Sequence, residues 1–311
     1  MEQKKDTLLE IHNLSVSFSM YGHGFERTDL KVISDLHLTV HPGEIVAIAG
    51  SSGSGKSLLA SAILGILPDN AVVEGHLHYK GRELTPDLQE KLRGKEIALV
   101  PQSVAYLDPL MKVGAQVDGH CRPKPVQKRR KLFERLQLPD NTPRLYPFQL
   151  SGGMARRVLV STALITDAEL IIADEPTPGM SLYQALEALK MFREMADEGR
   201  AVVLITHDID LAVEFADRVA VFYAGTTVET APASDFKMGV DALRHPYSKA
   251  LWRALPQNGF EPVPGFQPYA GNLPKGCLFA PRCPYKTEEC ERQVPPVREL
   301  RGGEVRCYHG T

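Results

Sequence analysis

The sequence predicts an α/β fold in which a mainly parallel sheet carries helices on its faces. Residues 45–49 read IVAIA and residues 170–173 read LIIA, and short apolar runs of this kind are typical of buried parallel strands. Two further strand patterns occupy residues 201–206 and 218–223, and residues 184–198 have a helical pattern. Repeated alternation of strand and helix indicates a sheet whose crossovers are helices.

Other segments add to this core. Residues 8–40 alternate and include turn residues at 21–24, which predicts an antiparallel β flank, and residues 75–79 are expected to return to it. The pattern over about 108–168 is mostly helical and predicts an inserted helical arm. Beyond about residue 230 the chain becomes rich in proline and cysteine. We therefore predict one large domain over 1–231 and a small C-terminal extension over 232–311.

Residues 50–57 read GSSGSGKS, a complete G-x-x-x-x-G-K-[ST] phosphate-binding loop between a predicted strand and a predicted helix. The glycines let consecutive N–H groups point at a phosphate, and the helix N-terminus adds partial positive charge. Lys56 is expected to reach the β- and γ-phosphates, and Ser57 to ligate Mg²⁺. The remaining expected contacts come from Gly50, Ser51, Ser52, Gly53, Ser54 and Gly55. The sequence therefore predicts a site for ATP and Mg²⁺.

The apolar run at 170–173 ends in two acids, Asp174 and Glu175. In nucleotide hydrolases with this loop, the first acid of such a pair holds Mg²⁺, so Asp174 takes that role by position. Glu175 would then polarise the attacking water. A solvated turn before Pro176 is the alternative for two adjacent acids, but the phosphate loop elsewhere in the chain favours the catalytic interpretation.

Residues 150–154 read LSGGM and precede a helical stretch. This motif, between a phosphate loop and an acidic strand, resembles the signature of ABC-type ATPases, and the resemblance covers roughly residues 8–230. It implies the P-loop NTPase fold of an ABC ATPase domain. It also implies that Gln102 is the glutamine of the Q-loop near Mg²⁺, that His207 contacts the γ-phosphate, and that Phe18 stacks on adenine. Glu175, His207 and Gln102 would be the catalytic residues.

The resemblance further implies a head-to-tail pair of ATPase subunits. Ser151, Gly152 and Gly153 precede a helix and would offer N–H groups to ATP held by the second subunit. One departure is Ser181, which stands where the family usually has the aspartate of the D-loop. It is either neutral variation or the mark of an asymmetric pair with a different second ATPase subunit. A regulatory subunit that binds ATP but hydrolyses it weakly is therefore an alternative.

The segment HPYSKAL at 245–251 and the proline-rich stretch after it resemble the C-terminal extension of ATPase subunits from oligopeptide, dipeptide and nickel importers. This implies an ATPase that powers import of a peptide, or of a chelated metal such as nickel. The implied partners are two transmembrane permeases, a second ATPase subunit and an extracytoplasmic substrate-binding protein. An exporter subunit, or an ABC ATPase acting on ribosomes or in DNA repair, is the rival interpretation.

Four of the five cysteines lie in the extension, with spacing C-x₅-C-x₆-C-x₁₆-C: Cys277, Cys283, Cys290 and Cys307. A cytosolic chain has little use for disulfides, so such clustering indicates metal first. Four thiolates suit zinc or an iron–sulfur cluster, but the chain lacks the short C-x₂₋₄-C knuckles usual for zinc. Some members of the resembling family hold a [4Fe–4S] cluster in this region. We expect that cluster, with zinc or unligated thiols as alternatives.

The net charge of −2 provides no strong field for nucleic acid. No apolar run approaches the roughly 20 residues that span a bilayer, and residues 1–6 lack the apolar core of a signal peptide. We therefore expect a peripheral protein at the cytoplasmic face of the cell membrane, whose membrane-spanning partners are separate chains.

Overall fold

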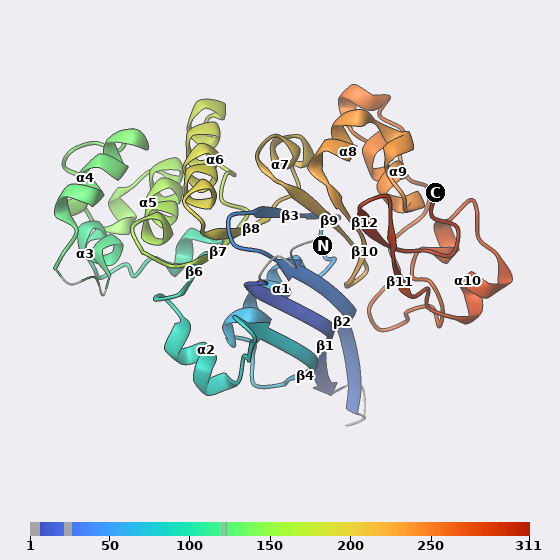
Figure 1. The fold of residues 1–311 in the computed structure, drawn as a ribbon. Helices are drawn as coiled ribbons and strands as arrows, with labels where there is room; N and C mark the ends of the chain where they lie inside the picture. Colours follow the sequence, from blue (N-terminus) through green and yellow to red (C-terminus); the bar gives the residue numbers. More distant parts are fainter. Residues whose placement is uncertain (1–6, 22–26, 120, 122) are drawn as a thin grey trace. The chain divides into compact units, whose positions relative to one another are not determined.

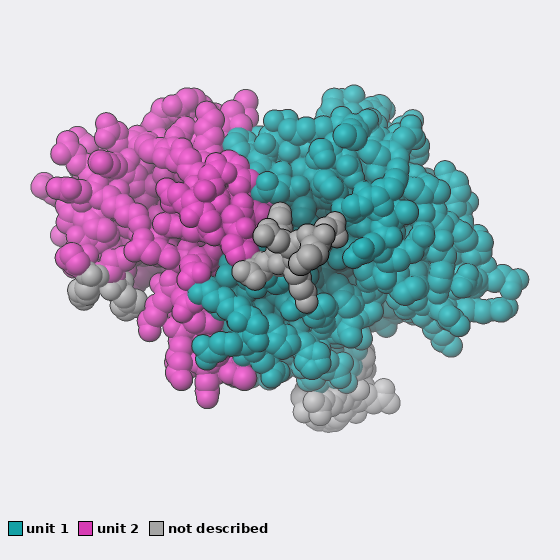
Figure 2. Space-filling model, viewed as in Figure 1, with its two compact units in different colours: residues 1–41, 46–84, 207–311 teal, residues 42–45, 85–206 magenta. Residues whose placement is uncertain are grey.

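The computed structural model describes residues 7–21, 27–119, 121 and 123–311. The chain forms two compact units, coloured separately in Figure 2: unit 1 contains residues 1–41, 46–84 and 207–311, and unit 2 contains residues 42–45 and 85–206. Residues 1–6, and residues 22–24 of the predicted turn, lie outside the described residues. None of the described helices has the length and apolar character needed to cross a membrane.

Unit 1 contains an antiparallel sheet with strand order β2-β1-β4-β5, the blue sheet of Figure 1. Its strands are β1 Leu9–Tyr21, β2 Arg27–Val40, β4 Ala71–Tyr79 and β5 Arg82–Glu83. One side of β1 is apolar and fully buried, including Leu9, Ile11 and Leu14. The predicted antiparallel flank is therefore present, and the segment after residue 70 returns to it.

The second set of strands in unit 1 has the order β11-β12-β10-β9-β3. Only β3 and β9 are parallel, with Gly50 opposite Phe222, and the other pairs are antiparallel. The strands are β3 Ile45–Gly50, β9 Arg218–Tyr223, β10 Thr226–Pro232, β11 Val297–Leu300 and β12 Gly303–Arg306. The helices of this unit are α1 Lys56–Leu64, α7 Ile209–Phe215, α8 Ala233–Met238, α9 Pro246–Arg253 and α10 Glu288–Arg292.

Unit 2 is built on three parallel strands in the order β8-β7-β6. They are β6 Ile97–Val100, β7 Leu170–Asp174 and β8 Ala201–Ile205, and β7 and β8 are buried along their whole length. The helices are α2 Pro86–Leu92, α3 Val113–Asp118, α4 Val126–Arg135, α5 Gly152–Leu164 and α6 Leu182–Asp197. Helices α3, α4 and α5 make up most of the predicted helical arm and pack on one another (Figure 1).

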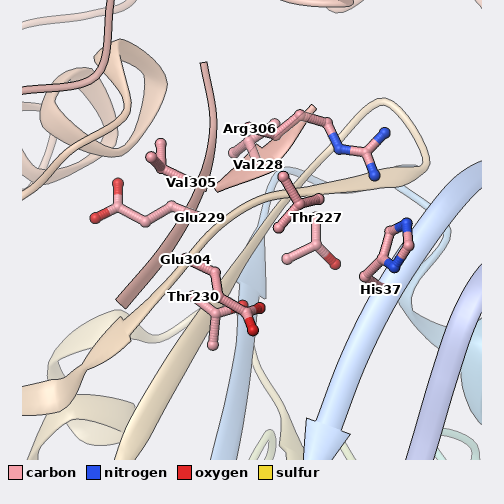
Figure 3. A pocket seen from close by; sticks show the side chains of 9 residues that line it. His37, Thr227, Val228, Glu229, Thr230, Glu304, Val305 and Arg306 are labelled. Carbon is pink, nitrogen blue, oxygen red and sulfur yellow. The ribbon is translucent and has the colours of Figure 1, made fainter. Parts of the chain in front are cut away.

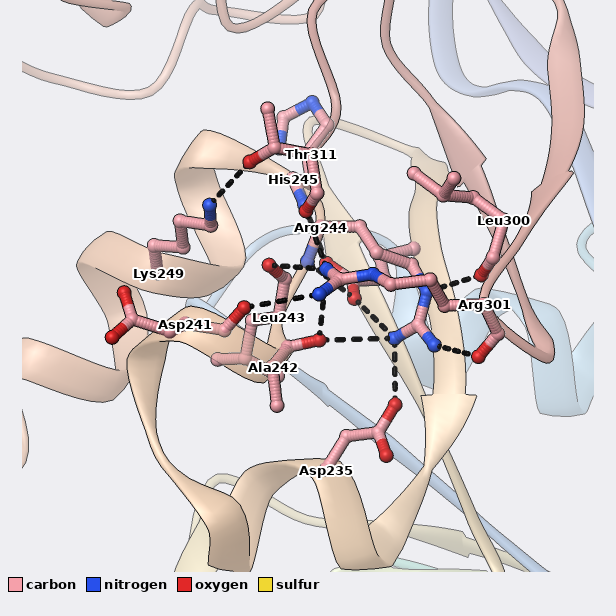
Figure 4. Close-up of polar contacts among 11 residues, drawn as sticks. Asp235, Asp241, Ala242, Leu243, Arg244, His245, Lys249, Leu300, Arg301 and Thr311 are labelled. Carbon is pink, nitrogen blue, oxygen red and sulfur yellow. Dashed lines mark hydrogen bonds and ion pairs between the residues drawn. The ribbon is translucent and has the colours of Figure 1, made fainter.

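The C-terminal residues add two strands to unit 1, because β12 pairs with β10 and β11 pairs with β12. The buried side chain of Arg244 links the added strands to the rest of unit 1 (Figure 4). Arg244 Nη1 lies 3.3 Å from Glu229 Oε1 and 2.8 Å from Asp235 Oδ2, while Nε donates to the Leu300 carbonyl at 2.6 Å and Nη2 to that of Arg301 at 2.5 Å. The Arg244 side chain is 1% exposed, so its charge depends on these partners.

Candidate active site

The phosphate loop runs from the end of β3 to the start of α1, in the predicted strand, loop and helix order. Gly53 and Gly55 have φ of +76° and +92°, conformations that favour glycine. At Gly50 a Cβ would lie 2.3 Å from the Phe222 carbonyl oxygen of β9, so only glycine fits there. Three glycines of the motif are thus required by the local backbone.

Lys56 is the first residue of α1, and its side chain is folded back over the loop. Its Nζ donates to the carbonyl oxygens of Gly50 and Ser51, both at 2.9 Å. The Ser51 carbonyl also accepts from the Ser54 N–H at 3.3 Å. Lys56 is buried, whereas Ser57 is exposed. These bonds tie the start of α1 to the first two residues of the loop and hold the lysine charge against it. A loop of this kind, which ends at a helix N-terminus, is suited to bind phosphate.

The two acids occupy the end of β7 in unit 2. Asp174 is buried, and Glu175 is half-buried with φ of +46°, which is uncommon for a residue with a side chain. The Glu175 N–H donates to the Ile205 carbonyl at 2.9 Å, and this bond helps to hold the unusual conformation. Gln102 Nε2 donates to Glu175 Oε2 at 3.2 Å. The structure therefore brings Gln102 and Glu175, two of the predicted catalytic residues, together.

Arg156 lies in the field of the same carboxylates. Burial lowers the pKa of the Arg156 guanidinium, and the charges of Glu175 and Asp174 partly oppose that effect. Its Nη1 donates to the Pro101 carbonyl, one residue before Gln102, at 3.2 Å. Sequence reasoning missed this arginine, since no motif marks it, although it lies three residues after Gly153 of the LSGG segment.

The LSGG segment opens helix α5. Ser151 is the N-cap residue, and its Oγ accepts from the Met154 N–H at 3.3 Å. Ser151 and Gly152 are exposed, and open space surrounds the position of a Cβ on Gly152. At Gly153, by contrast, a Cβ would lie 2.9 Å from the Gly179 carbonyl oxygen. The segment therefore presents an accessible helix N-terminus with little side-chain bulk.

Ser181, the departure from the family pattern, has a structural role at the start of α6. Its Oγ accepts from the Gln184 N–H at 3.4 Å, and its own N–H donates to Gln184 Oε1 at 3.3 Å. This is a reciprocal capping box. The spacing Ser-x-x-Gln could have indicated it in the sequence.

The other two predicted contacts lie in unit 1. His207 lies two residues after the end of β8 and is exposed. The neighbouring Asp208 caps α7 by accepting from the Leu211 N–H at 3.0 Å. Phe18 lies in β1 opposite Leu30 of β2 and Ala71 of β4, and it is partly exposed. A partly exposed aromatic on a strand is available to stack on a ligand ring.

The four cysteines of the extension are free thiols, of which Cys290 and Cys307 are buried. The Cys277 N–H donates to the Cys290 carbonyl at 2.8 Å. Burial, helped by Cys307 and Cys290, raises the pKa of the Cys277 thiol to about 11. Within the described part of the chain, no group of three or more Cys, His, Asp or Glu side chains is arranged to hold a metal ion. The described thiols therefore do not fit the predicted cluster as they stand.

A small cavity lies among β10, β12 and His37 of β2, with His37 and Arg306 toward one end (Figure 3). Burial lowers the pKa of His37, and the charge of Arg306 lowers it further. The cavity volume is about 10 Å³. That is room for about one water molecule, so this cavity is not a ligand site.

Two family descriptions match the chain. Residues 33–178 match the ABC transporter family, and residues 228–290 match the oligopeptide/dipeptide transporter C-terminal region. A putative peptide import ATP-binding protein of Brucella melitensis biotype 1 is 35% identical over 98% of this chain and 95% of its own length. The chain belongs to the ATP-binding subunits of ABC transporters. This membership and the predicted ABC ATPase fold are therefore confirmed.

Other proteins similar to this ATP-binding subunit are also named as ATP-binding proteins or cassettes. The dipeptide transport ATP-binding protein DppD of Escherichia coli K12 is 35% identical, over 97% of this chain and 96% of its own. The oligopeptide transport ATP-binding protein OppD of the same strain is 33% identical, over 99% and 94%. An ATP-binding cassette solved as a dimer in a post-hydrolysis state with ADP and Pi has a TM-score of 0.64 at 25% identity, over 73% of this chain and 99% of the other.

Proposed function

We propose that this ABC ATP-binding subunit hydrolyses MgATP to power the import of peptides through separate permeases. The observation that carries the proposal is the closed phosphate loop, in which Lys56 crosses to the carbonyls of Gly50 and Ser51. Peptide is the favoured cargo because the relatives with the C-terminal region are named for peptide transport. None of those names supports the predicted nickel cargo.

The proposed chemistry assigns a role to each site residue. The loop N–H groups and Lys56 bind the phosphates, and Phe18 stacks on adenine. The hydroxyl of Ser57, the amide of Gln102 and the carboxylate of Asp174 are oxygen donors of the kind that Mg²⁺ takes, and the bound ion would neutralise phosphate charge. Glu175 orients the water and His207 holds the γ-phosphate. Positioning and charge neutralisation supply most of the rate enhancement.

The proposed assembly contains two permeases, a second ATP-binding subunit and an extracytoplasmic substrate-binding protein, at the cytoplasmic face of the membrane. Ser151, Gly152 and Gly153 would complete the ATP site of the second subunit, and the exposed N-terminus of α5 supports this assignment. Whether that subunit is a different chain is best tested by purification of the complex. Recovery of two permeases and a second ATPase from gently solubilised native membranes would support a heterodimeric importer, and absence of permeases would contradict transport.

The phosphate loop itself is tested by Lys56→Ala. Loss of the buried ammonium removes both a phosphate contact and the two bonds that close the loop, so the affinity for a fluorescent ATP analogue should fall at least tenfold. Lys80→Ala is a matched control, since Lys80 is exposed in the turn after β4. Near-wild-type affinity in Lys56→Ala would contradict the assignment.

We separately propose a [4Fe–4S] cluster on Cys277, Cys283, Cys290 and Cys307. The presence of four free thiols in one segment supports this proposal. The arrangement of the described side chains does not support it, so the thiols would have to rearrange to bind a cluster. Iron and acid-labile sulfide measured on anaerobically purified protein test it. Stoichiometric zinc would indicate a tetrathiolate zinc site instead, and neither metal would indicate packed thiols. No step of the proposed hydrolysis depends on this group.

A further inference from the structure

The C-terminal region contacts the phosphate loop at Ser51. Ser51 Oγ donates to Gln267 Oε1 at 2.6 Å across 216 positions of sequence, and both residues belong to unit 1. The Tyr247 hydroxyl also lies near the hydroxyl and backbone of Ser51. Burial raises the pKa of Tyr247, and these groups of Ser51 lower it by a smaller amount, so the Tyr247 hydroxyl stays protonated. Gln267 therefore holds Ser51 by a hydrogen bond from outside the motif, and the Tyr247 hydroxyl lies near the same residue.

Tyr247 is fixed in a cluster of three aromatic rings, which we call the aromatic anchor: Tyr223, Tyr247 and Phe279. The Tyr247 ring centroid lies 4.5 Å from that of Tyr223 and 5.4 Å from that of Phe279. Tyr223 and Tyr247 are 0% and 3% exposed, so both rings have little freedom to move. Tyr223 follows Phe222, whose carbonyl faces Gly50. Strand β9 therefore carries one ring of the anchor and also lies against the start of the loop.

Gln267 lies in residues 260–272, a stretch without helix or strand. Arg282 holds this stretch, because its Nε donates to the Pro264 carbonyl at 2.7 Å and its Nη2 to the Val263 carbonyl at 2.8 Å. The Arg282 guanidinium lies over the aromatic anchor, 5.8 Å from the Tyr223 ring centroid. The anchor therefore supports both side chains that reach Ser51.

Ser51 is well placed to control the loop. Its carbonyl accepts from Lys56 Nζ and from the Ser54 N–H, while its side chain is held by the C-terminal region. We propose that Tyr247 and Gln267 are positioning residues for ATP binding, which hold Ser51 and thereby keep Lys56 and the loop in the shape that receives phosphates. The proposal rests on the proposed ATP binding and adds that the C-terminal region takes part in it.

The first test compares the affinity for a fluorescent ATP analogue among four proteins: wild type, Gln267→Ala, Tyr247→Phe and the control Gln293→Ala. Gln293 is an exposed glutamine of the same region. Loss of one polar contact that preorganises Ser51 should weaken binding about two- to tenfold in Gln267→Ala and Tyr247→Phe, with turnover at saturating ATP nearly unchanged. Gln293→Ala should bind as wild type does.

A double-mutant cycle then separates positioning from general destabilisation. If Gln267 acts through Ser51, the double variant Ser51→Ala/Gln267→Ala should bind no more weakly than Ser51→Ala alone. Additive losses would overturn the proposal. So would wild-type affinity in both Gln267→Ala and Tyr247→Phe. If wild type itself bound no ATP analogue, the proposed function would fail, and not the coupling alone.

The coupling must also act in reverse, because a linkage between two sites is reciprocal. Phe266 and Tyr269 flank Gln267 and are 94% and 70% exposed, so chymotrypsin can report on this stretch in the intact protein. MgATP should slow cleavage after these residues in wild type by at least twofold, and should leave it unchanged in Lys56→Ala. A cleavage rate in wild type that is indifferent to MgATP would overturn the proposal.

Discussion

At the scale of single residues, Glu175 combines a positive φ with a carboxylate that accepts from Gln102. A backbone conformation of this kind costs about 1–3 kcal/mol, and such costs persist mainly where the surroundings or the function require them. The bond from the Glu175 N–H to Ile205 ties the residue to the neighbouring strand. The backbone therefore sets the direction in which the Glu175 side chain leaves the chain, and the bond from Gln102 orients its carboxylate.

We expect Glu175→Gln to keep ATP binding and to lower turnover in the assembled complex by two or more orders of magnitude. The amide has nearly the same shape but cannot accept a proton from the water, and a positioned general base contributes 10²–10⁴-fold. Steady-state ATPase rates measure this effect. Glu169→Gln, at the exposed approach to the same strand, is the control. Undiminished ATP hydrolysis in Glu175→Gln would mean that another residue orients the attacking water.

His245 predicts a pH dependence of stability. Its buried ring caps α9, with Nδ1 accepting from the Tyr247 N–H at 3.0 Å, and burial lowers the pKa of His245 from 6.5 to about 3. Between these values the unfolded chain binds a proton that the folded chain does not. The free energy of unfolding therefore includes the full contribution of the neutral His245 above pH 6.5. This contribution is lost as the pH falls toward 3, by about 1.5 kcal/mol between pH 6.5 and 5.

Denaturant unfolding at several pH values measures this loss. His245→Asn is the matched variant, because asparagine is a good N-cap acceptor that does not titrate. Its stability should fall less between pH 6.5 and 5 than that of wild type. Equal slopes for the two proteins would mean that the imidazole is not the responsible group.

At the scale of elements, the sequence motifs lie at the N-termini of helices. Lys56 and Ser151 stand at the starts of α1 and α5, and Ser181 starts α6 with a capping box. Ser181, at the position where the resemblance led us to expect an aspartate, therefore caps a helix. Serine and aspartate are comparable N-caps, so the substitution costs the helix little.

Ser181→Ala should therefore lower the free energy of unfolding by about 1 kcal/mol, through the loss of the bond to the Gln184 N–H. Ser181→Asp should keep wild-type stability and restore the usual charge of the family. If Ser181 reflects an asymmetric pair, Ser181→Asp should also change the ATPase rate of the complex while its stability stays the same. Chemical denaturation and ATPase assays on both variants separate these effects.

Features that depend on residues close together in the sequence could be predicted, and features that depend on distant contacts could not. Strands β3, β7, β8 and β9 were predicted from local apolar runs, and the phosphate loop from a motif of eight residues. Strands β10, β11 and β12 were missed, because charged residues such as Glu229 and Arg306 interrupt their apolar character and are satisfied only by distant partners. The bond from Gln267 to Ser51 leaves no local pattern and could be found only in the structure.

At the scale of the whole chain, Arg244 joins β10, α8, the last residue of β11 and the residue after it in unit 1 (Figure 4). Removing one member of a buried ion pair leaves its partner uncompensated, so Arg244→Met should cost about 3–5 kcal/mol. Arg292→Met, which breaks an exposed pair with Glu288, should cost less than about 1 kcal/mol. Thermal unfolding of both variants tests the contrast, and similar costs would contradict the role given to Arg244.

The strand order β11-β12-β10 has a consequence for biosynthesis. Unit 2 contains no residue after 206, whereas β10 gains its outer neighbour only when residues 303–306 have left the ribosome. During that interval β10 presents an uncovered edge, the kind of surface on which nascent chains associate wrongly. We therefore expect ribosome-bound chains halted near residue 290 to contain a protease-resistant unit 2 beside a chaperone-dependent unit 1, and rare codons late in the gene to lower the yield of folded protein.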